Sequence, residues 1–432
     1  MNDSIHAALE RNFNSPIRDV LWGHIYLSPE LEALSSSAGF MRLHRILQLG
    51  PTHIVYPGAT HTRAAHSIGV YHLARRLLIH LAGRGADSWL SAEGARSFLC
   101  AALLHDLGHF PYTHSLKELP LASHEELTGK LILIEPMKRL VGDTGADPYM
   151  SAAIIDTSLP TSGSQELRFY RKLLSGALDP DKLDYLNRDA RYCGVPYGAQ
   201  DVDFILSRLW PDPEQGLLID TRAIPSVESV LFSKYLMYRT VYWHPAVRSA
   251  TAMIKKALVG ALKNQRIAKE ELYNLDDQGL FTLLAERAQS CGVSHGDPLF
   301  SLGAKVRDGR LYVVAAEFLY NEAQHQRLAD IEKRYLLEQE LAARLRIRPD
   351  ELIIDVPEPI SFETGLGIHE DKGHIGASVF TAETIDAFRK ELRVVRVFVD
   401  PAHENALRSM PEDLCNVLQR GIPEAGGDSL SK

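Results

Sequence analysis

Apolar residues recur at intervals of three and four over most of the chain. Between about residues 62 and 262 this spacing predicts a run of helices that each bury one face. Clusters of turn residues interrupt the spacing and predict the helix boundaries, near 83–87, 142–148, 160–163 and 211–216. Before this region, WGHIYL predicts a short extended segment, and helices are expected over 29–34 and 39–49. Within it, PDPEQGLLIDTRAIP predicts a small hairpin.

The pattern changes beyond about residue 274. RLYVVAAEF, ELIIDVP and RVVRVFVD are rich in β-branched residues and predict strands, with helices expected near 322–345 and 382–392. Strands that alternate with helices predict a small α/β appendage on a mainly α core. The expected domains are therefore 1–273 and 274–420, followed by a disordered tail at 421–432. Within the second domain, SFETGLGIHEDKGHIG predicts a surface loop, with a mobile lid or an oligomer contact as alternatives.

Composition and charge exclude several classes of protein. A hydrophobic content of 45% and a charged content of 24% are typical of a soluble globular protein. The formal net charge of -8 weighs against a dedicated nucleic-acid binder. The chain lacks both an N-terminal signal core and an apolar run of about twenty residues. We therefore expect a cytoplasmic protein without membrane association. The cysteines show no CxxC spacing and predict neither a zinc site nor a disulfide framework: Cys100, Cys193, Cys291 and Cys415.

Candidate chemistry begins in LCAALLHDLGHFPYTH. Helical spacing places His105 on the apolar face of this segment, and Asp106 follows it directly. Gly108 and Pro111 indicate that the helix ends here, where neighbouring side chains can converge on one ion. Burying a carboxylate beside an imidazole is costly without a cation or a full set of hydrogen bonds. The alternative interpretation is a helix end with a polar cap.

Two further segments carry residues of the same kind. His66 lies on the apolar stripe of a predicted helix, where a lone histidine is more often a packing residue than a ligand. Arg63 shares that face three residues earlier, which suits a site that must hold an anion beside a metal-bound imidazole. Asp181 opens the predicted helix of ALDPDKLDYLNRDARYCGV.

This ordered set resembles the HD-domain metal-dependent phosphohydrolases, and in particular their deoxynucleoside-triphosphate triphosphohydrolase branch. The resemblance rests on GATHTRAAHSIGV, LLHDLGHFPYTH, SHEELT and DPDKLDYLNRDARYCGV, together with LWGHIYLSPELEAL and FMRLHRILQLG. It spans about residues 17 to 254. An HD dipeptide alone is a weak signal, whereas the ordered set with these flanks is specific. The resemblance implies a mainly α fold, an HD-domain helical core with a small C-terminal α/β appendage.

By this resemblance the metal ligands are His66, His105, Asp106 and Asp181. Two imidazoles and two carboxylates suit one divalent ion and leave coordination positions for water and a phosphate oxygen. The ligand types do not distinguish Mn, Fe, Mg, Zn, Ni or Co. A second Mg²⁺ that accompanies the nucleotide is compatible with the resemblance.

The same resemblance assigns the catalytic histidines. His114 takes the position of the general acid/base, His109 that of a phosphate contact, and His124 that of a histidine lining the site. The family usually has a carboxylate three residues after the acid/base histidine, where this chain has Lys117. A lysine cannot accept the histidine's proton. Either Glu118 replaces that carboxylate or the reaction differs.

Further positions resemble the family's substrate contacts. They are Arg63, Gln48, Lys182, Tyr185, Asp189, Lys234 and Tyr242. Gln48 resembles a contact to the base, although the sequence after it departs from the family's glycine-rich pattern. For Lys182 the alternative is a solvated charge, and for the tyrosines it is a place in the core. Arg42, His44 and Arg45 could add a basic cleft for a triphosphate.

The resulting hypothesis is metal-dependent hydrolysis of a deoxynucleoside triphosphate to deoxynucleoside and triphosphate. One alternative is another phosphohydrolase activity of the superfamily, such as a single-strand nuclease, which would need a longer basic groove with stacking aromatics. Another is a weakly active nucleotide-binding regulator, which Lys117 supports and the complete ligand set opposes. Expected partners are the nucleotide and, by resemblance, further copies of the chain. Nucleic acid is not favoured.

Overall fold

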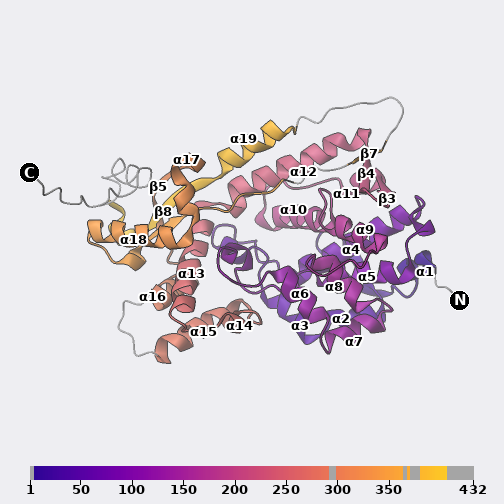
Figure 1. The fold of residues 1–432 in the computed structure, drawn as a ribbon, viewed down its shortest axis with the longest axis horizontal. Helices are drawn as coiled ribbons and strands as arrows, with labels where there is room; N and C mark the ends of the chain where they lie inside the picture. Colours follow the sequence, from indigo (N-terminus) through magenta and orange to yellow (C-terminus); the bar gives the residue numbers. More distant parts are fainter. Residues whose placement is uncertain (1–3, 291–297, 363–366, 370–379, 406–432) are drawn as a thin grey trace, which may run out of the picture. The chain divides into compact units, whose positions relative to one another are not determined.

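The computed structural model describes residues 4–290, 298–362, 367–369 and 380–405. These residues fall into two compact units, whose ribbons are shown in Figure 1. The first unit comprises Met1–Tyr242, Ile267–Leu283 and Phe362–Thr381, and the second comprises Trp243–Arg266, Leu284–Ser361 and Ala382–Lys432. Helices dominate both, so the prediction of a mainly α fold with a small α/β region is confirmed.

Helices form the core of the first unit. They are α1 (Ile5–Glu10), α2 (Pro29–Ser35), α3 (Ala38–Arg42), α4 (Arg63–Ala82), α5 (Ala92–Leu104), α6 (His124–Ile132), α7 (Met137–Asp143), α8 (Pro148–Ile155), α9 (Gln165–Leu174), α10 (Pro180–Cys193), α11 (Val202–Ser207), α12 (Ile224–Met237) and α14 (Lys269–Leu272). Helix α4 packs against α5 and α10, α5 against α8, and α8 against α6 and α9 (Figure 1). Leu73, Leu77, Phe98 and Tyr170 are fully buried between them, and the last two rings stack at 5.0 Å. Apolar burial of this kind is the main stabilising contribution in a domain of this size.

The helices that carry the candidate residues begin at side-chain caps. Thr62 accepts a hydrogen bond from the Ala65 backbone N–H at the start of α4, and Ser91 caps α5. Asp179 caps α10, with Pro180 in the first turn. Such caps satisfy backbone donors that have no partner inside the helix. The candidate side chains therefore project from well-defined first and last turns.

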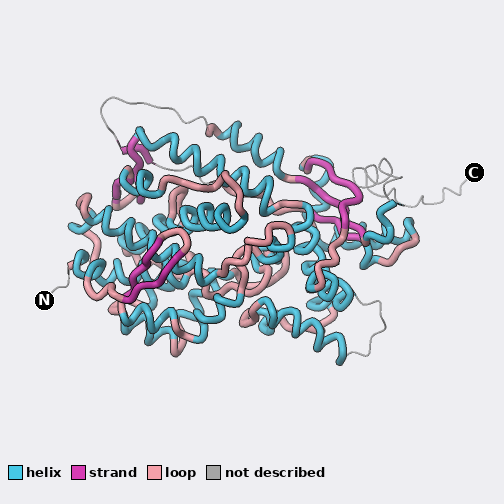
Figure 2. Tube along the Cα trace, turned by 180° about the vertical axis from the view of Figure 1, so that it is seen from behind, coloured by secondary structure: helices cyan, strands magenta, loops and turns pink. Residues whose placement is uncertain are grey.

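Strands add two small sheets to the first unit. Strands β1 (Ser15–Asp19) and β2 (Gly23–Leu27) form an antiparallel hairpin, drawn in magenta in Figure 2. Strands β3 (Leu209–Asp212) and β4 (Gly216–Asp220) form the hairpin that PDPEQGLLIDTRAIP predicts, so this prediction is confirmed. Strand β7 (Gly367–His369) pairs in parallel with β4. Part of the predicted loop is therefore a strand, while 363–366 and 370–376 lie outside the described residues.

The helix predicted over residues 39–49 is wrong in its second half, because the helix ends earlier than expected. Helix α3 ends at Arg42, and Leu43–Arg45 form a single 3₁₀ turn. Ile46 is extended and its carbonyl accepts the Arg63 backbone N–H, while Leu47 forms an isolated bridge with Thr62. Pairing with the segment before α4 thus competes successfully with helix propensity, which is a weak preference.

The second unit combines helices with an antiparallel sheet. Its elements are α13 (Pro245–Lys263), α16 (Pro298–Arg307), β5 (Val313–Leu319), α17 (Glu322–His325), α18 (Ile331–Leu345), β6 (Leu352–Asp355), α19 (Ala382–Leu392) and β8 (Val394–Val399), while α15 (Asp277–Ser290) spans the division. The strand order is β5-β8-β6, with antiparallel pairing throughout. The three predicted strands are confirmed. The expected boundary at residue 273 does not coincide with the compact units, because α13 packs against α16 and β6.

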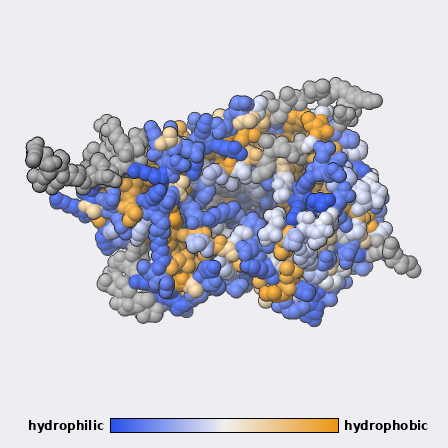
Figure 3. Space-filling view, in the orientation of Figure 1, coloured by the Kyte–Doolittle hydropathy of each residue, from blue (hydrophilic) through white to orange (hydrophobic). Residues whose placement is uncertain are grey.

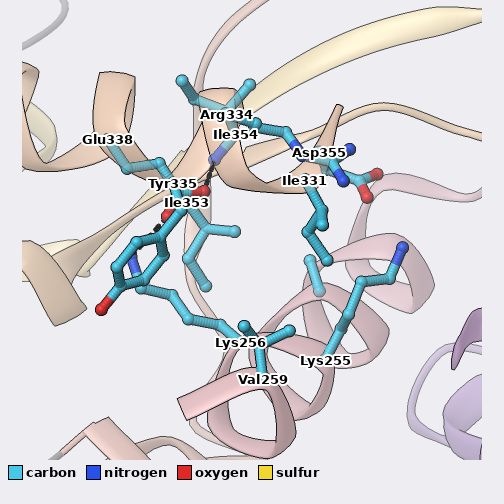
Figure 4. Close-up of a pocket in the computed structure, with 11 residues that line it drawn as sticks. Lys255, Lys256, Val259, Ile331, Arg334, Tyr335, Glu338, Ile353, Ile354 and Asp355 are labelled. Atoms are coloured by element: carbon cyan, nitrogen blue, oxygen red, sulfur yellow. Dashed lines mark hydrogen bonds and ion pairs between the residues drawn. The ribbon is translucent and has the colours of Figure 1, made fainter. Parts of the chain in front are cut away.

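The buried Lys256 of the second unit has charged and polar partners. Lys256 Nζ donates to Glu338 Oε2 at 2.8 Å and to the carbonyl oxygens of Pro349 and Leu352. Figure 4 shows these side chains around a pocket between α13, α18 and β6. The cavity volume is about 30 Å³, which holds about one water molecule. This pocket is therefore too small for a nucleotide.

The surface and the long helices show no membrane-spanning element among the residues that the structure describes. None of the described helices combines the length and the apolar content that crossing a bilayer requires. On the face shown in Figure 3, hydrophobic residues lie in separate patches among hydrophilic ones. Cys100 and Cys193 are free thiols. Cys291, Cys415 and the predicted tail lie outside the described residues.

Gly69 generates the first prediction. It lies in α4 against α10, where an added Cβ would be 2.0 Å from Asp184 Oδ1 and 2.4 Å from an Arg188 guanidinium nitrogen. These two side chains are buried and bonded to each other. We expect Gly69→Ala to lower the free energy of unfolding by about 1–3 kcal/mol, because the ion pair must shift. Chemical denaturation of the full chain measures this change.

Gly260 provides the matched control. It lies within α13, and an added Cβ would meet no atom within 4 Å. Gly260→Ala should leave stability unchanged or raise it by up to about 1 kcal/mol, because alanine favours the helix. Equal effects of the two substitutions would contradict the proposed collision at Gly69.

Candidate metal centre

Three helices bring the predicted metal ligands together. His66 lies one turn into α4, His105 caps the end of α5, and Asp181 lies in the first turn of α10. His66 Nε2 is 2.9 Å from Asp181 Oδ1, and His105 Nε2 is 3.8 Å from the same oxygen. These three side chains form a group whose ligand atoms could hold a metal ion. The predicted convergence of distant segments is thus present in the fold.

Asp106 completes the group from the position after His105. Its Oδ1 lies 3.4 Å from His105 Nε2, and its Oδ2 accepts a hydrogen bond from Arg63 at 2.8 Å. Burial alone would raise the pKa of Asp106, but His109, His105 and the Arg63 guanidinium hold it well below its usual range. The buried carboxylate is therefore ionised and available to a cation.

The donor set fits a divalent ion. His105 Nδ1 lies 2.9 Å from the Ala102 carbonyl oxygen, while its buried Nε2 has no hydrogen-bond partner among the described residues. Leaving a buried polar nitrogen without a partner costs free energy, which a bound cation would offset. Burial lowers the pKa of His66, but hydrogen bonds to Asp181 and Asp184 outweigh it and raise it to about 10. A metal ion and a proton therefore compete for His66 Nε2.

Asp184 is a residue that the sequence analysis missed. Its Oδ2 accepts the Nδ1–H of His66 at 2.8 Å, so Nε2 faces Asp181. Arg188 donates twice to Asp184, at 2.8 and 2.9 Å, and also binds Asp19 of β1. Trp22 Nε1 donates to the same carboxylate at 2.6 Å. The spacing of Asp181, Asp184 and Arg188 on one helix was the sequence signal that could have indicated Asp184. In the fold, this network orients His66 in the way that outer-shell carboxylates orient the ligands of metals.

Three histidine rings lie next to the metal ligands. The His109 ring is stacked on His124 at 3.9 Å between centroids, and His114 is 4.8 Å from His109 and 5.3 Å from His124. His109 is fully buried, whereas His114 is exposed. The sequence-predicted catalytic histidines are therefore adjacent, with His114 on the solvent side.

One of these three histidines, His124, has a carboxylate next to its ring. Glu125 lies 3.1 Å from His124 Nδ1. Lys117 is exposed and Glu118 is half-buried beyond the turn Thr113–Leu116 that carries His114. The replacement of the usual carboxylate by Glu118 stays a prediction.

Gly108 allows the backbone of the loop after α5 to approach the backbone of α6 beside these histidines. An added Cβ at Gly108 would lie 2.3 Å from the His124 carbonyl oxygen and 2.6 Å from the Thr128 backbone nitrogen. Gly108 N donates to Thr128 Oγ1 at 2.8 Å, and this hydroxyl donates to the His105 carbonyl oxygen. Because backbone meets backbone here, only glycine fits without displacement of α6. This contact sets His109 beside His124.

The expected basic cleft at Arg42 is not formed. The Arg42 guanidinium is buried and donates to the carbonyl oxygens of Leu107, His109 and Leu275, at 2.6, 2.5 and 3.0 Å. These bonds fix the loop after the His105–Asp106 pair. Arg45 pairs with Asp276. Arg42 is therefore a structural clamp, because its donors are directed to backbone carbonyls.

Two candidate sugar contacts, Asp189 and Tyr242, are bonded to each other. Tyr242 Oη donates to Asp189 Oδ2 at 2.6 Å, and His61 Nε2 lies 2.7 Å from Asp189 Oδ1. His61 was not singled out from the sequence. Its carbonyl oxygen accepts the Gln48 backbone N–H, and the buried Gln48 Oε1 has no hydrogen-bond partner among the described residues. Hydrogen bonds thus connect Tyr242, Asp189, His61 and the Gln48 backbone.

The candidate phosphate cations are engaged within the protein. Lys182 Nζ donates to Asp179 at 2.7 Å and to the Gly176 carbonyl oxygen at 3.1 Å. Lys234 is buried, and its Nζ lies 5.5 Å from the centre of the Phe362 ring. Tyr185 is half-buried against the core of the first unit. A phosphate contact by Lys182 would require it to exchange or share its present partners.

The Asp184 network generates the second prediction. Asp184→Asn should weaken binding of a divalent ion by about 10–100-fold, because His66 loses the charged acceptor that orients it. Isothermal titration with Mn²⁺ measures this affinity. Asp203→Asn is the control, because Asp203 is exposed and pairs with a partly exposed Arg76. Unchanged affinity in a folded Asp184→Asn variant would contradict this role.

Comparisons with known proteins agree with this geometry. Residues 63–137 match the HD domain, and residues 206–416 match the HD associated region. The protein YwfO of Bacillus subtilis is 36% identical over 225 residues, which cover 51% of this chain and 49% of YwfO. Human deoxynucleoside triphosphate triphosphohydrolase SAMHD1 is 27% identical over 293 residues, which cover 60% of this chain and 45% of SAMHD1. The aligned part spans about half the length of these relatives.

A solved structure shares the fold. A phosphohydrolase from Bacteroides thetaiotaomicron superposes with a TM-score of 0.68, covering 89% of this chain and 99% of the other, at 23% sequence identity. The matched segment 63–137 contains His66, His105 and Asp106, the residues that converge with Asp181 in the fold. The chain therefore contains an HD domain, which is followed by an HD-associated region.

Proposed function

We propose that this protein hydrolyses deoxynucleoside triphosphates to deoxynucleoside and triphosphate, with one divalent metal ion held by His66, His105, Asp106 and Asp181. The observation that carries the proposal is the approach of His66 and His105 to the same oxygen of Asp181, from three separate helices. Two imidazoles and two carboxylates leave coordination positions open for water and a phosphate oxygen.

The protein's own residues have distinct roles in this proposal. When bound, the ion supplies Lewis-acid polarisation of the α-phosphoryl group and a bound water of lowered pKa. His114 is exposed beside the buried histidines, a position suited to transferring a proton to or from substrate. Arg63 holds Asp106 in place and adds positive charge next to it. His109, Lys182 and Lys234 are proposed to offset phosphate charge.

The nucleotide specificity rests on relatives. Human SAMHD1 is a deoxynucleoside triphosphate triphosphohydrolase by name, and it is 27% identical to this chain over the aligned part. Asp189, Tyr185 and Tyr242 are proposed to contact the sugar, Gln48 the base, and His124 to line the site. The bond between Tyr242 and Asp189 supports their joint action on one part of the substrate.

The third prediction tests the reaction. The full chain is incubated with a panel of ribo- and deoxynucleotides and several divalent ions, and released triphosphate, pyrophosphate and phosphate are separated. We expect triphosphate from a deoxynucleotide, with loss of turnover after chelation and recovery on adding the ion back. Release of pyrophosphate from an alarmone, or cleavage confined to single-stranded DNA ends, would assign a different activity.

The fourth prediction separates metal binding from proton transfer. His105→Ala should lose both bound metal and turnover, because it removes a ligand. His114→Ala should keep the metal and lose turnover by about 10²–10⁴-fold, the usual contribution of a general acid or base. Elemental analysis of the purified variants and the triphosphate assay measure the two effects. The exposed His24 of β2 provides the control His24→Ala, which should alter neither.

A further inference from the structure

We infer that Asp277 is a positioning residue of the candidate site, which holds the backbone of Leu47 and Gln48 in place for binding of the nucleotide base. This inference deepens the proposed function and rests on it for the role of Gln48 as the base contact. Asp277 is the first residue of α15, in the part of this helix that belongs to the first unit. Its Oδ2 accepts the Leu47 backbone N–H at 2.9 Å, across 230 positions of the sequence.

Residues 46–48 pair on one side with the residues that lead into α4. The Ile46 carbonyl oxygen accepts the Arg63 N–H, and the Gln48 N–H donates to the His61 carbonyl oxygen, each at 3.0 Å. These two groups face the same neighbouring segment, as alternate groups do in an antiparallel ladder. One side of the Gln48 backbone is therefore fixed by the start of α4.

The Leu47 N–H points to the other side and needs a different partner. Successive backbone groups of a paired segment alternate in direction, so the segment before α4 does not reach this N–H. Asp277 supplies the acceptor that a second strand would otherwise provide. Backbone N–H groups that are withdrawn from water almost always have a partner. The carboxylate therefore fixes this segment from the side opposite α4.

The hydrogen bond, more than the charge, is the interaction by which Asp277 acts. Burial raises the pKa of Asp277 to about 6, against the lowering effect of the Leu47 N–H and Arg63. Asp276 raises this pKa further, and His53 lowers it. A carboxylate and a carboxylic acid both offer an oxygen that accepts an N–H. The contact with Leu47 therefore persists in both protonation states, and an uncharged acceptor of the same shape should replace it.

The chain just before Asp277 is itself anchored. Arg42 donates to the Leu275 carbonyl oxygen at 3.0 Å. The Gly279 N–H donates to Asp276 Oδ1 at 2.8 Å, so Asp276 caps α15 independently of Asp277. Substitution of Asp277 is therefore expected to leave the start of the helix in place.

The side chain of Gln48 depends on the backbone that Asp277 holds. Its buried Oε1 has no hydrogen-bond partner among the described residues, so it is available to an N–H or O–H of a ligand. A site that hydrogen-bonds its substrate discriminates strongly against a group that lacks the matching donor. Movement of Leu47 and Gln48 would misplace this acceptor, which weakens both binding and selection of the base.

The competing interpretation is that Asp277 only stabilises the fold. A less stable variant contains less active protein, which lowers the apparent kcat and leaves KM unchanged. A misplaced Gln48 instead raises KM and reduces the differences among bases. The two interpretations therefore predict changes in different kinetic parameters.

The fifth prediction compares two substitutions of Asp277 in the full chain, with the triphosphate-release assay. Asp277→Ala should raise the KM for the preferred deoxynucleoside triphosphate by about 10-fold and narrow the spread of kcat/KM among the four deoxynucleotides, while kcat changes by less than about threefold. Asp277→Asn should keep KM within about threefold of the wild-type value, because its amide oxygen accepts the Leu47 N–H. Asp276→Asn is the matched control, because asparagine also caps helices and Asp276 bonds to Arg45 rather than to Leu47. It should leave KM unchanged.

Amide hydrogen exchange without nucleotide tests the contact itself. Asp277→Ala should speed the exchange of the Leu47 N–H by about 10-fold or more, whereas Asp277→Asn should not. Unchanged exchange in Asp277→Ala, or faster exchange with unchanged KM and base selection, would overturn the inference and leave the proposed function standing. So would an Asp277→Asn variant that behaves like Asp277→Ala.

Absence of triphosphate release from every deoxynucleotide by the wild-type protein would overturn the proposed function and this inference together. Far-UV circular dichroism establishes that the variants are folded. If Asp277→Ala is not, Asp277→Glu takes its place with the same expected results, because the longer side chain displaces the acceptor and keeps the charge.

Discussion

The first unit depends on buried carboxylates that have partners at the junction of α4, α5 and α10. Asp184 binds Arg188, His66 and Trp22, while Asp106 binds Arg63. An unpaired carboxylate in such surroundings would cost several kcal/mol, on the order of the whole stability of a domain. The pairs therefore determine how the three helices can pack, and the candidate ligands follow from that packing. Arg188 extends the constraint to the N-terminal hairpin through Asp19.

A second constraint acts on the loop after α5. Arg42 binds the carbonyl oxygens of Leu107 and His109, and Gly108 allows the backbone to touch α6. Both contacts use backbone atoms of the loop, so its path does not depend on the side chains that carry the chemistry. Because its backbone is held in this way, the loop can carry two costly buried groups in a stable structure. They are His109, whose ring nitrogens have no hydrogen-bond partner among the described residues, and the ionised Asp106. Strained or costly groups persist at a site when their surroundings hold them.

Several candidate substrate contacts are bonded to other residues of the protein. Lys182 is bonded to the N-cap Asp179, and Asp189 to Tyr242 and His61. These residues are held by internal partners, so the proposed binding of a nucleotide would require exchange of partners as well as new contacts. Exchange of a charge-assisted bond for another of the same kind changes the free energy little, while it adds geometric selectivity. His114 differs from them, because it is exposed beside the buried rings.

The sequence alone determined the helical core, the three strands of the second unit, and the choice of His66, His105, Asp106 and Asp181 as a group. Periodicity carries the information on helices and strands, because it is local in the chain. The choice of the four ligands comes from the resemblance to the HD-domain phosphohydrolases. The end of α3 at Arg42, the place of α13 in the second unit and the burial of Arg42 were decided by tertiary contacts. The same holds for the pairing of Asp184 with His66 and for the approach of His109, His124 and Asp106. These features join residues that are distant in sequence, and the distances between them exist only once the helices have packed.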